Sequence, residues 1–296
     1  MRRILLSAIV AGAIVAPPAT AQDKPAETDS TFVLRTRLPA GAWARIYTFN
    51  GDVEVREGTG DQLEVRGEKR GRRTRWDRVF FETKRDGENV TVCALYGDEA
   101  ECDNDGIHGN MNSSNVGTRF VVTLPRGAKV RVSSGNGDVS VRAAAAEARA
   151  SSGNGEVEVA GVRGAVNAST GNGALLIEDA GGPVEASTGN GRVTINTAAG
   201  PVSASSGNGN IDVRMARLAG DGDMEFRTGN GRVSVAVPAS FEGEVVTSTG
   251  HGRLESDFPM TVSGRMDSRN MRATIGKGGR RLRMSSGNGD LELRKM

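Results

Sequence analysis

A Gly-Asn-Gly tripeptide recurs at a fixed interval along the second half of this chain. Its first five asparagines, from Asn136 to Asn208, are evenly spaced, and the next two copies, the second of which reads Gly250-His251-Gly252, follow after slightly longer intervals. The gap before the last copy, at Asn288, contains the degenerate copy Arg269-Asn270-Met271. Such a regular repeat is typical of solenoids, in which each unit stacks on a copy of itself. The predicted turn column comprises Asn136, Asn154, Asn172, Asn190, Asn208, Asn230, His251, Asn270 and Asn288.

Each repeat contains two short segments in which apolar and polar residues alternate. In one unit, Val184-Glu185-Ala186-Ser187-Thr188 precedes the Gly-Asn-Gly turn and Arg192-Val193-Thr194-Ile195 follows it. A second turn, ending in Gly200-Pro201, leads to the next unit. Alternation with a period of two predicts strands with one buried face. The residues expected in the core are Val184, Ala186, Val193 and Ile195, and those expected at the surface are Glu185, Arg192 and Thr194.

Two topologies could build short strands from such a pattern, antiparallel hairpins and a coiled solenoid. Hairpins would have turns of one kind, whereas here two different turns each recur once in every repeat. The pattern therefore favours an all-β fold, a single-stranded parallel β-helix (β-solenoid) with about 18 residues per coil. Nine such coils, spaced by about 4.8 Å, would be roughly 40 Å long. Aromatic residues make up only 4% of the chain, as expected for a narrow interior filled by aliphatic side chains.

The tripeptide suits a tight corner because glycine, and to a lesser degree asparagine, tolerates positive φ. Glycine accounts for 41 of the 296 residues, and the repeat explains much of that excess. Stacked asparagines can also hydrogen-bond to one another along the solenoid axis. We interpret His251, which occupies this column, as a variant spacer and not as a catalytic residue.

The chain begins with the pattern of a secretory signal peptide over residues 1–21. Arg2-Arg3 precedes an apolar run, and Ala19-Thr20-Ala21 forms a small-residue cleavage motif. The apolar run is short for a bilayer span, which disfavours the alternative of an N-terminal membrane anchor. The prediction is an exported protein, periplasmic or at the cell surface, with no transmembrane segment after cleavage.

Residues 22–128 are predicted to form irregular β-structure that caps the solenoid, and residues 129–296 to form its regular repeat. Asn50-Gly51-Asp52-Val53-Glu54-Val55 matches a single early coil within the first of these segments. A cap is expected because the end strands of a solenoid have unpaired backbone groups. The C-terminal end has almost no such cap, so end-to-end self-association is one expectation. The strands expected before the repeat are 32–38, 44–49, 79–83, 90–95 and 120–124.

The formal charge gives no support to nucleic-acid binding. The chain has 38 basic and 36 acidic residues, and the predicted signal peptide contains two of the basic residues and no acidic ones. The mature chain is therefore balanced, whereas a general affinity for phosphate backbones requires an excess of positive charge.

Cys93 and Cys102 are the only two cysteines. In an oxidising compartment they most simply form one disulfide that closes a short loop. Ligation of a metal by this pair is the alternative, although no CxxC motif or nearby histidine pair supports it.

The segment around Cys102 is similar to the start of a calcium-binding loop, with carboxylates at Glu101, Asp103 and Asp105. The twelfth position is Asn112, where an EF-hand has a glutamate, so a solvated acidic loop is the alternative. A calcium ladder along the whole solenoid is excluded, because the residue after each Gly-Asn-Gly turn varies from aspartate to alanine and arginine. No cofactor is predicted.

A basic cluster surrounds Trp76 before the repeat begins. Arginine suits bidentate binding of phosphate and carboxylate, so one hypothesis is contact with anionic envelope polymers or lipid headgroups. A solvated loop balanced by Asp77 and Glu82 is the alternative. The cluster consists of Lys69, Arg70, Arg72, Arg73, Arg75 and Arg78.

The unit Ser/Thr-Gly-Asn-Gly-x-Val-x-Val resembles the β-strand repeats of the DUF4097 family of candidate bacterial adhesins. Leu38-Pro39-Ala40-Gly41 and Asn50-Gly51-Asp52-Val53-Glu54-Val55 are similar to the usual opening of that family. Phe120-Val121-Val122-Thr123-Leu124-Pro125-Arg126-Gly127 is similar to the strand that leads into its repeats. The resemblance covers nearly all of the mature chain. It implies a right-handed β-helix related to the toast-rack domains of envelope-stress proteins, and it implies no catalytic residues.

These observations predict an exported, non-enzymatic binding or scaffold protein of the bacterial envelope or surface. Repeated weak contacts along a polar sheet face would give avidity toward a repetitive ligand such as a polysaccharide. A self-assembling structural or envelope-stress module is the second hypothesis, and a polysaccharide-acting enzyme is the third. The outward columns contain no consistent set of acids, bases or nucleophiles, which disfavours the enzyme.

Overall fold

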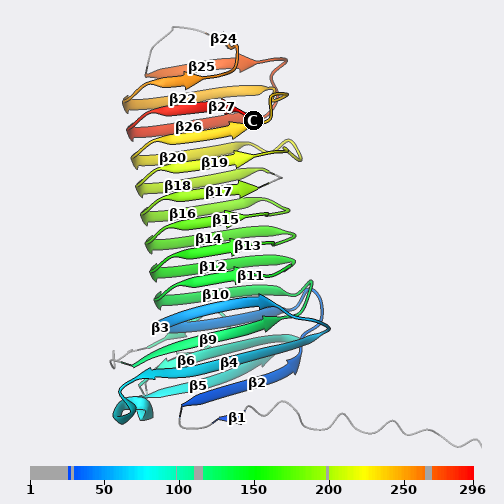
Figure 1. The fold of residues 1–296 in the computed structure, drawn as a ribbon, viewed down its shortest axis with the longest axis vertical. Helices are drawn as coiled ribbons and strands as arrows, with labels where there is room; N and C mark the ends of the chain where they lie inside the picture. Colours follow the sequence, from blue (N-terminus) through cyan, green and yellow to red (C-terminus); the bar gives the residue numbers. More distant parts are fainter. Residues whose placement is uncertain (1–25, 28–29, 98, 110–115, 198–199, 264–268) are drawn as a thin grey trace, which may run out of the picture.

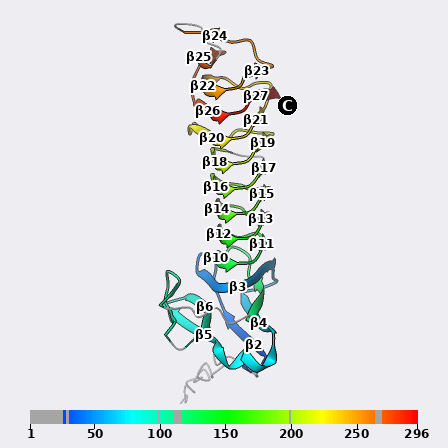
Figure 2. The same ribbon diagram turned by 90° about the vertical axis from the view of Figure 1, so that its left-hand side faces the viewer.

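The computed structural model describes residues 26–27, 30–97, 99–109, 116–197, 200–263 and 269–296. The described chain is a tall stack of short strands, which forms one 25-stranded sheet and one separate two-stranded sheet. Figure 2 shows that the stack is narrow in one direction and widens at its N-terminal end. The predicted signal peptide lies outside the described residues. No helix in the described parts of the chain is long and apolar enough to cross a membrane.

Each coil of the stack consists of a longer strand, the Gly-Asn-Gly turn and a shorter strand. Successive coils pair in parallel and in register, so that Val130 lies beside Ala148 and Ala148 beside Val166. Six coils follow one another in this way: β10 and β11 (Lys129–Asn136, Val139–Arg142), β12 and β13 (Glu147–Asn154, Val157–Ala160), β14 and β15 (Ala165–Asn172, Leu175–Glu178), β16 and β17 (Val184–Asn190, Val193–Thr197), β18 and β19 (Val202–Asn208, Ile211–Met215), and β20 and β21 (Met224–Asn230, Val233–Val237).

The alternating pattern places aliphatic side chains inside each coil. Val184, Ala186, Val193 and Ile195 are all buried, as the sequence predicts. The longer strand also buries a polar residue, Thr188, next to the turn. Aromatic rings are almost absent from the regular interior. Phe226 is fully buried in β20, where its neighbours in the stack are Ala204 and Met284.

The asparagines of the turns form a continuous ladder. The Nδ2 of Asn154 donates to the Oδ1 of Asn136 at 2.8 Å, and the pattern repeats upward through the stack at 2.7–2.8 Å. All of these amides point the same way, each donating toward the N-terminal end. His251 ends the ladder, with its Nδ1 3.1 Å from the Oδ1 of Asn288.

A second, buried ladder lies just inside the first. The hydroxyl of Thr188 donates to the carbonyl oxygen of Gly173 in the preceding coil at 3.0 Å. Equivalent bonds, of 2.7–3.1 Å, satisfy the hydroxyls of Ser134, Ser152, Thr170, Ser206, Thr228, Thr249 and Ser286. Because an unpaired buried hydroxyl is costly, this bond explains why serine or threonine stands two positions before each asparagine.

The second glycine of the turn is required for steric reasons. Gly191 has a φ of +155°, and a Cβ added there would lie 1.9 Å from the carbonyl oxygen of Gly173. That oxygen belongs to the backbone of the coil below, which cannot move without disrupting the stack. The close approach of the two turns therefore excludes any side chain at this position.

The N-terminal segment opens the stack with one long strand, β3 (Trp43–Glu57), which bends at Asn50-Gly51. Asn50 lies beside Asn136, so β3 is the coil that the sequence predicts at 50–55, although several other strands separate it from β10 in the chain. Below β3, one face continues through β6 (Asn89–Tyr96) and β5 (Val79–Asp86), and the other through β9 (Val116–Leu124), β4 (Gln62–Gly71), β2 (Thr31–Arg37) and β1 (Ala26–Glu27).

Antiparallel pairing of β2, β4 and β5 ends the parallel stack. The rings of Phe32, Phe81 and Phe120 fill the wider interior of this N-terminal region. Phe32 stacks on Phe81 with centroids 5.2 Å apart, and Phe81 meets Phe120 edge to face at 5.5 Å.

The C-terminal end differs from the expected order of coils. The last coil, β26 and β27 (Arg281–Asn288, Leu291–Lys295), lies between β20–β21 on one side and β22–β23 (Gly243–His251, Leu254–Ser256) on the other. In Figure 1 this coil is red and lies below the gold β22. The final strand is therefore not an open edge, which corrects the expectation of an uncapped C-terminus.

Asn270 is also placed differently from the prediction. It begins β25 (Asn270–Ile275), which runs antiparallel to β22 and closes the stack together with β24 (Thr261–Val262). Its Oδ1 accepts a hydrogen bond from the Ser248 hydroxyl at 2.7 Å, outside the asparagine ladder. The degenerate copy at 269–271 is thus part of a terminal hairpin, because an antiparallel strand ends a stack that a further parallel coil would extend.

The buried ladder generates a prediction for stability. Thr188→Val keeps the shape of the side chain but removes the bond to the Gly173 carbonyl, and it should lower the free energy of unfolding by about 1–3 kcal/mol in urea denaturation. Ser187→Ala, on the exposed face of the same strand, is the matched control and should change it by less than about 0.5 kcal/mol. Equal effects of the two substitutions would contradict a stabilising role for the ladder.

Candidate functional site

Two adjoining hollows lie on the outer face of β3, β10 and β12, where the stack meets the cap. One has a volume of about 250 Å³ and is lined by Trp43, Arg45, Arg131, Arg149 and the loop residues Asn104 and Asp105. The other, of about 440 Å³, continues past Tyr47 toward Phe49 and the serines Ser133 and Ser151. We refer to these two hollows, with the lining residues just given, as the Trp43 groove.

Parallel pairing aligns the basic residues of the groove. Arg45, Arg131 and Arg149 are direct neighbours on three adjacent strands. Trp43 is half-buried beside them. The Arg149 guanidinium lies over its ring at 5.0 Å, and the Lys129 ammonium at 5.4 Å. Cations held against an aromatic face are attracted by its quadrupole, so this pocket combines a ring with clustered positive charge.

The loop beside the groove is anchored by Asn104. The Tyr47 hydroxyl donates to its backbone carbonyl at 3.0 Å, and Arg45 and the Thr91 hydroxyl donate to its Oδ1 at 3.2 and 3.1 Å. The Cys93–Cys102 disulfide joins the start of this loop to β6, with an S–S distance of 1.98 Å. The two cysteines that the sequence predicts to pair therefore hold one wall of the groove in place.

Burial and charge both affect Tyr47 within this site. Desolvation raises the pKa of its hydroxyl, and the nearby Arg131 and Arg45 oppose that rise. Its phenol therefore stays protonated and able to donate to Asn104 across the physiological range. The Arg131 guanidinium lies 5.8 Å from its ring and pairs with Asp105 at 3.5 Å.

Two of the acidic residues considered as calcium ligands, Asp103 and Asp105, form hydrogen bonds or ion pairs within the protein. Asp103 accepts hydrogen bonds from the backbone amides of Asp105 and Gly106 at 2.7 and 2.9 Å, and it pairs with His108 at 3.0 Å. Glu101 lies on the short strand β7 (Glu101–Cys102), paired with β8 (Ile107–His108). In the parts of the chain that are described, no group of three or more histidine, cysteine or acidic residues could hold a metal ion.

The predicted basic cluster lies away from the groove, at the far end of the cap. It surrounds the short 3₁₀ helix Arg73–Arg78, drawn in cyan at the base of Figure 1. Lys69 donates to the carbonyl of Trp76 at 3.2 Å, and Arg73 lies 5.9 Å from the Trp76 ring. The structure therefore separates this cluster, which includes the exposed Arg70, Arg72, Arg75 and Arg78, from the Trp43 groove.

The groove itself was not predicted from the sequence. Arg45 is distant in the chain from Arg131 and Arg149 and joins them only because β3 pairs with β10. One signal was available: Trp43-Ala44-Arg45-Ile46-Tyr47 places tryptophan, arginine and tyrosine on the outward positions of an alternating strand. Aromatic rings that alternate with an arginine on one face of a strand are the groups that form cation–π contacts.

The ordering of the loop by Asp103 should depend on pH. The amide of Asp105, above all, lowers the pKa of the Asp103 carboxyl below its ordinary value of 3.8. The ionised form thus stabilises the loop above that value, and the stabilisation is lost as pH falls through the lowered pKa. The protection factors of the amides at residues 105–108 should therefore fall as the pH drops below 3.8, and Asp103→Asn should remove this dependence. Asp105→Asn should retain it; an unchanged pH profile in Asp103→Asn would refute this role.

Comparison with known proteins gives one family and several distant folds. A candidate cell adhesion protein of Clostridium sporogenes is 10% identical, with a TM-score of 0.30 over 92% of this chain and 100% of the other. A candidate adhesin of Bacteroides fragilis is 11% identical, with a TM-score of 0.37 over 91% of this chain and 98% of the other. A candidate adhesin of Parabacteroides distasonis is 10% identical, with a TM-score of 0.38 over 88% of this chain and 96% of the other.

Similarity at this level assigns no ligand to this chain. No curated protein matches it. The sequence profile of the Toastrack DUF4097 family matches residues 45–294, from the first coil to the last. With the stacked parallel coils described above, this match shows that the chain belongs to the Toastrack DUF4097 family.

Proposed function

We propose that this protein is an exported, adhesin-like binding protein that holds an acidic polysaccharide in the Trp43 groove. The observation that carries the proposal is the alignment of Arg45, Arg131 and Arg149 along the groove beside the ring of Trp43. Sugar rings stack on indole faces, and arginine binds carboxylates in a bidentate manner. A chain of uronic acids presents both groups at every residue.

The arginines remain available to such a ligand. Arg131 pairs with Asp105, whose side chain is 84% exposed, and the two atoms are 3.5 Å apart. An ion pair this exposed contributes about 0–1 kcal/mol, so a ligand carboxylate can replace Asp105 at small cost. Arg149 pairs with Glu147 at 2.8 Å, and its side chain, which lies 5.0 Å from the Trp43 ring, is 53% exposed.

The architecture supports binding and not catalysis. The two hollows are lined by arginines, aromatic rings, serines and the exposed Asp105, and the histidine that lines them, His108, is paired with Asp103. Beyond the groove, the outward row of the sheet continues as Ser169, Ser187 and Ser205 on successive strands. A regular row of hydroxyls offers repeated weak contacts to an extended polymer, which adds avidity without chemistry. The protein therefore acts as a rigid, non-enzymatic binding scaffold.

Binding to polygalacturonate tests the proposal, with neutral dextran as the comparison polymer. Trp43→Ala and the pair Arg131→Ser with Arg149→Ser should each weaken binding to the acidic polymer by about tenfold or more, because stacking and ion pairing are both lost. Binding should also weaken at high salt, which screens the charges. The measurement is the Kd by isothermal titration calorimetry.

The matched control uses the basic cluster at the far end of the cap. Arg72→Ser with Arg75→Ser removes the same number of positive charges from exposed positions and should leave the Kd within about twofold. If this control weakened binding as much as the groove variants, the ligand would be bound by general charge, and the proposed site would be wrong. Equal binding of dextran and polygalacturonate would exclude an acidic ligand.

A further inference from the structure

The last coil, residues 281–296, lies between two coils that precede it in the sequence, β20–β21 and β22–β23, and we call this position the slot. β26 pairs in parallel with β20 on one side and with β22 on the other. β27 does the same between β21 and β23. Among the strand pairs described, β22 has partners only in β25 and β26. The terminal hairpin is therefore attached to the stack through the last coil.

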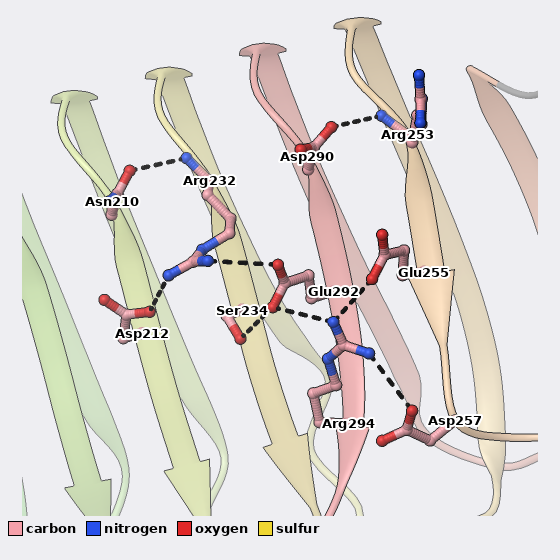
Figure 3. A network of polar contacts seen from close by, with 10 residues as sticks. All are labelled: Asn210, Asp212, Arg232, Ser234, Arg253, Glu255, Asp257, Asp290, Glu292 and Arg294. Atoms are coloured by element: carbon pink, nitrogen blue, oxygen red, sulfur yellow. Dashed lines mark hydrogen bonds and ion pairs between the residues drawn. The ribbon is translucent and has the colours of Figure 1, made fainter.

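The slot is lined by charges that match this coil. Glu292 lies 3.4 Å from Arg232 on the β21 side, and the Ser234 hydroxyl donates to it at 3.2 Å. Arg294 pairs on the β23 side with Glu255 at 2.8 Å and Asp257 at 3.4 Å. Figure 3 shows these contacts as one continuous network across three strands. The coil thus has ion pairs on both sides, and on the β20 side Arg283 also lies 3.8 Å from Glu225.

The corners of the coil match the slot as well. Asn288 donates to Asn230 at 2.7 Å and lies 3.1 Å from His251, and the backbone amide of Arg253 donates to Asp290 at 2.9 Å. Inside, Leu282, Met284, Leu291 and Leu293 are fully buried. The fit is therefore specific in shape, hydrogen bonding and charge to the sequence 281–296.

Only a short hinge ties the coil to its own chain. The hinge, Gly276-Lys277-Gly278-Gly279-Arg280, follows β25 and has three glycines with positive φ. No strand follows β27 in the described residues, so the coil can leave the slot without unthreading another strand of the stack. Each contact that it makes inside the slot would be the same if the slot belonged to another molecule, and exchange of identical elements is a low-cost route to dimers.

We propose that residues 281–296 exchange between two copies of this chain, so that the coil of each molecule fills the slot of the other. The charge and corner contacts above select a second copy as the occupant. At low protein concentration each slot is filled by the coil of its own molecule, because the short linker gives this coil an effective concentration in the millimolar range. At high protein concentration, residues 281–296 leave their own slot and enter the slot of a second molecule. This exchange joins two solenoids at the ends that carry β22–β27.

The test mixes two full-length forms with different affinity tags. They are incubated together at the lowest urea concentration at which hydrogen exchange shows the amides of 281–296 opening, then returned to buffer at high protein concentration. The expected result is a species of doubled mass that carries both tags, by two-step affinity capture and light scattering. If the amides open and no two-tag species forms, the proposal is overturned.

A disulfide lock provides the matched control. Arg227 and Ser285 are neighbours in register on β20 and β26, and neither belongs to the network of Figure 3. Arg227→Cys with Ser285→Cys should hold the coil in its own slot when oxidised and abolish the two-tag species, and reductant should restore it. Wild-type protein in the same reductant controls for opening of Cys93–Cys102. A two-tag species that survives the oxidised lock would overturn the proposal.

A hinge variant keeps the test decisive if the locked protein does not fold. Deleting Gly278 and Gly279 shortens the path over β22, which strains the closed monomer but not the exchanged dimer. The dimer fraction at equal protein concentration should then rise severalfold relative to wild type. A hinge variant that folds and remains monomeric at all concentrations would contradict exchange of the coil.

Discussion

The interaction on which the structure depends is the close contact between successive Gly-Asn-Gly corners. At each corner a buried hydroxyl donates to a glycine carbonyl of the coil below, and an exposed asparagine amide donates to the asparagine below it. Both bonds require that equivalent residues of neighbouring coils lie directly above one another. A slip of one residue would bury the polar face and break both ladders, so the corners fix the register of every strand between them.

A stack fixed in this way has an edge strand with unpaired backbone groups at each end. At both ends of this chain, antiparallel strands follow the parallel coils. At the N-terminal end, β3 bends between both faces, and antiparallel strands then replace parallel ones. At the C-terminal end, the antiparallel hairpin of β24 and β25 closes the sheet. The last coil lies within the stack, between β20 and β22. Two of the outermost strands, β1 at the N-terminal end and β24 at the C-terminal end, are each only two residues long, and edge strands this short offer little template to other chains.

The features proposed to carry function lie at these two departures from the repeat. The Trp43 groove forms where β3, which is distant in sequence, pairs with the first regular coil and a disulfide-bonded loop overhangs the joint. The exchangeable coil lies where the chain order and the stacking order differ. Between them the coils are nearly identical, and they serve as a rigid spacer with a uniform polar face.

The sequence alone determined the repeat, the alternation, the asparagine column from Asn136 to Asn230 and the early coil at 50–55, because each depends on local spacing and on the properties of single residues. It also identified the serine or threonine before each turn without giving its role, since the acceptor belongs to another coil.

Tertiary structure alone decided which coils are neighbours. Asn270 was assigned to the column because its spacing fitted, yet its strand runs antiparallel, and Asn288 lies between Asn230 and His251. Equivalent coils can stack in more than one order with the same local pattern. The choice among orders depends on contacts between distant segments, such as Glu292 with Arg232 and Arg294 with Glu255, and on the pairing that unites the arginines of the groove.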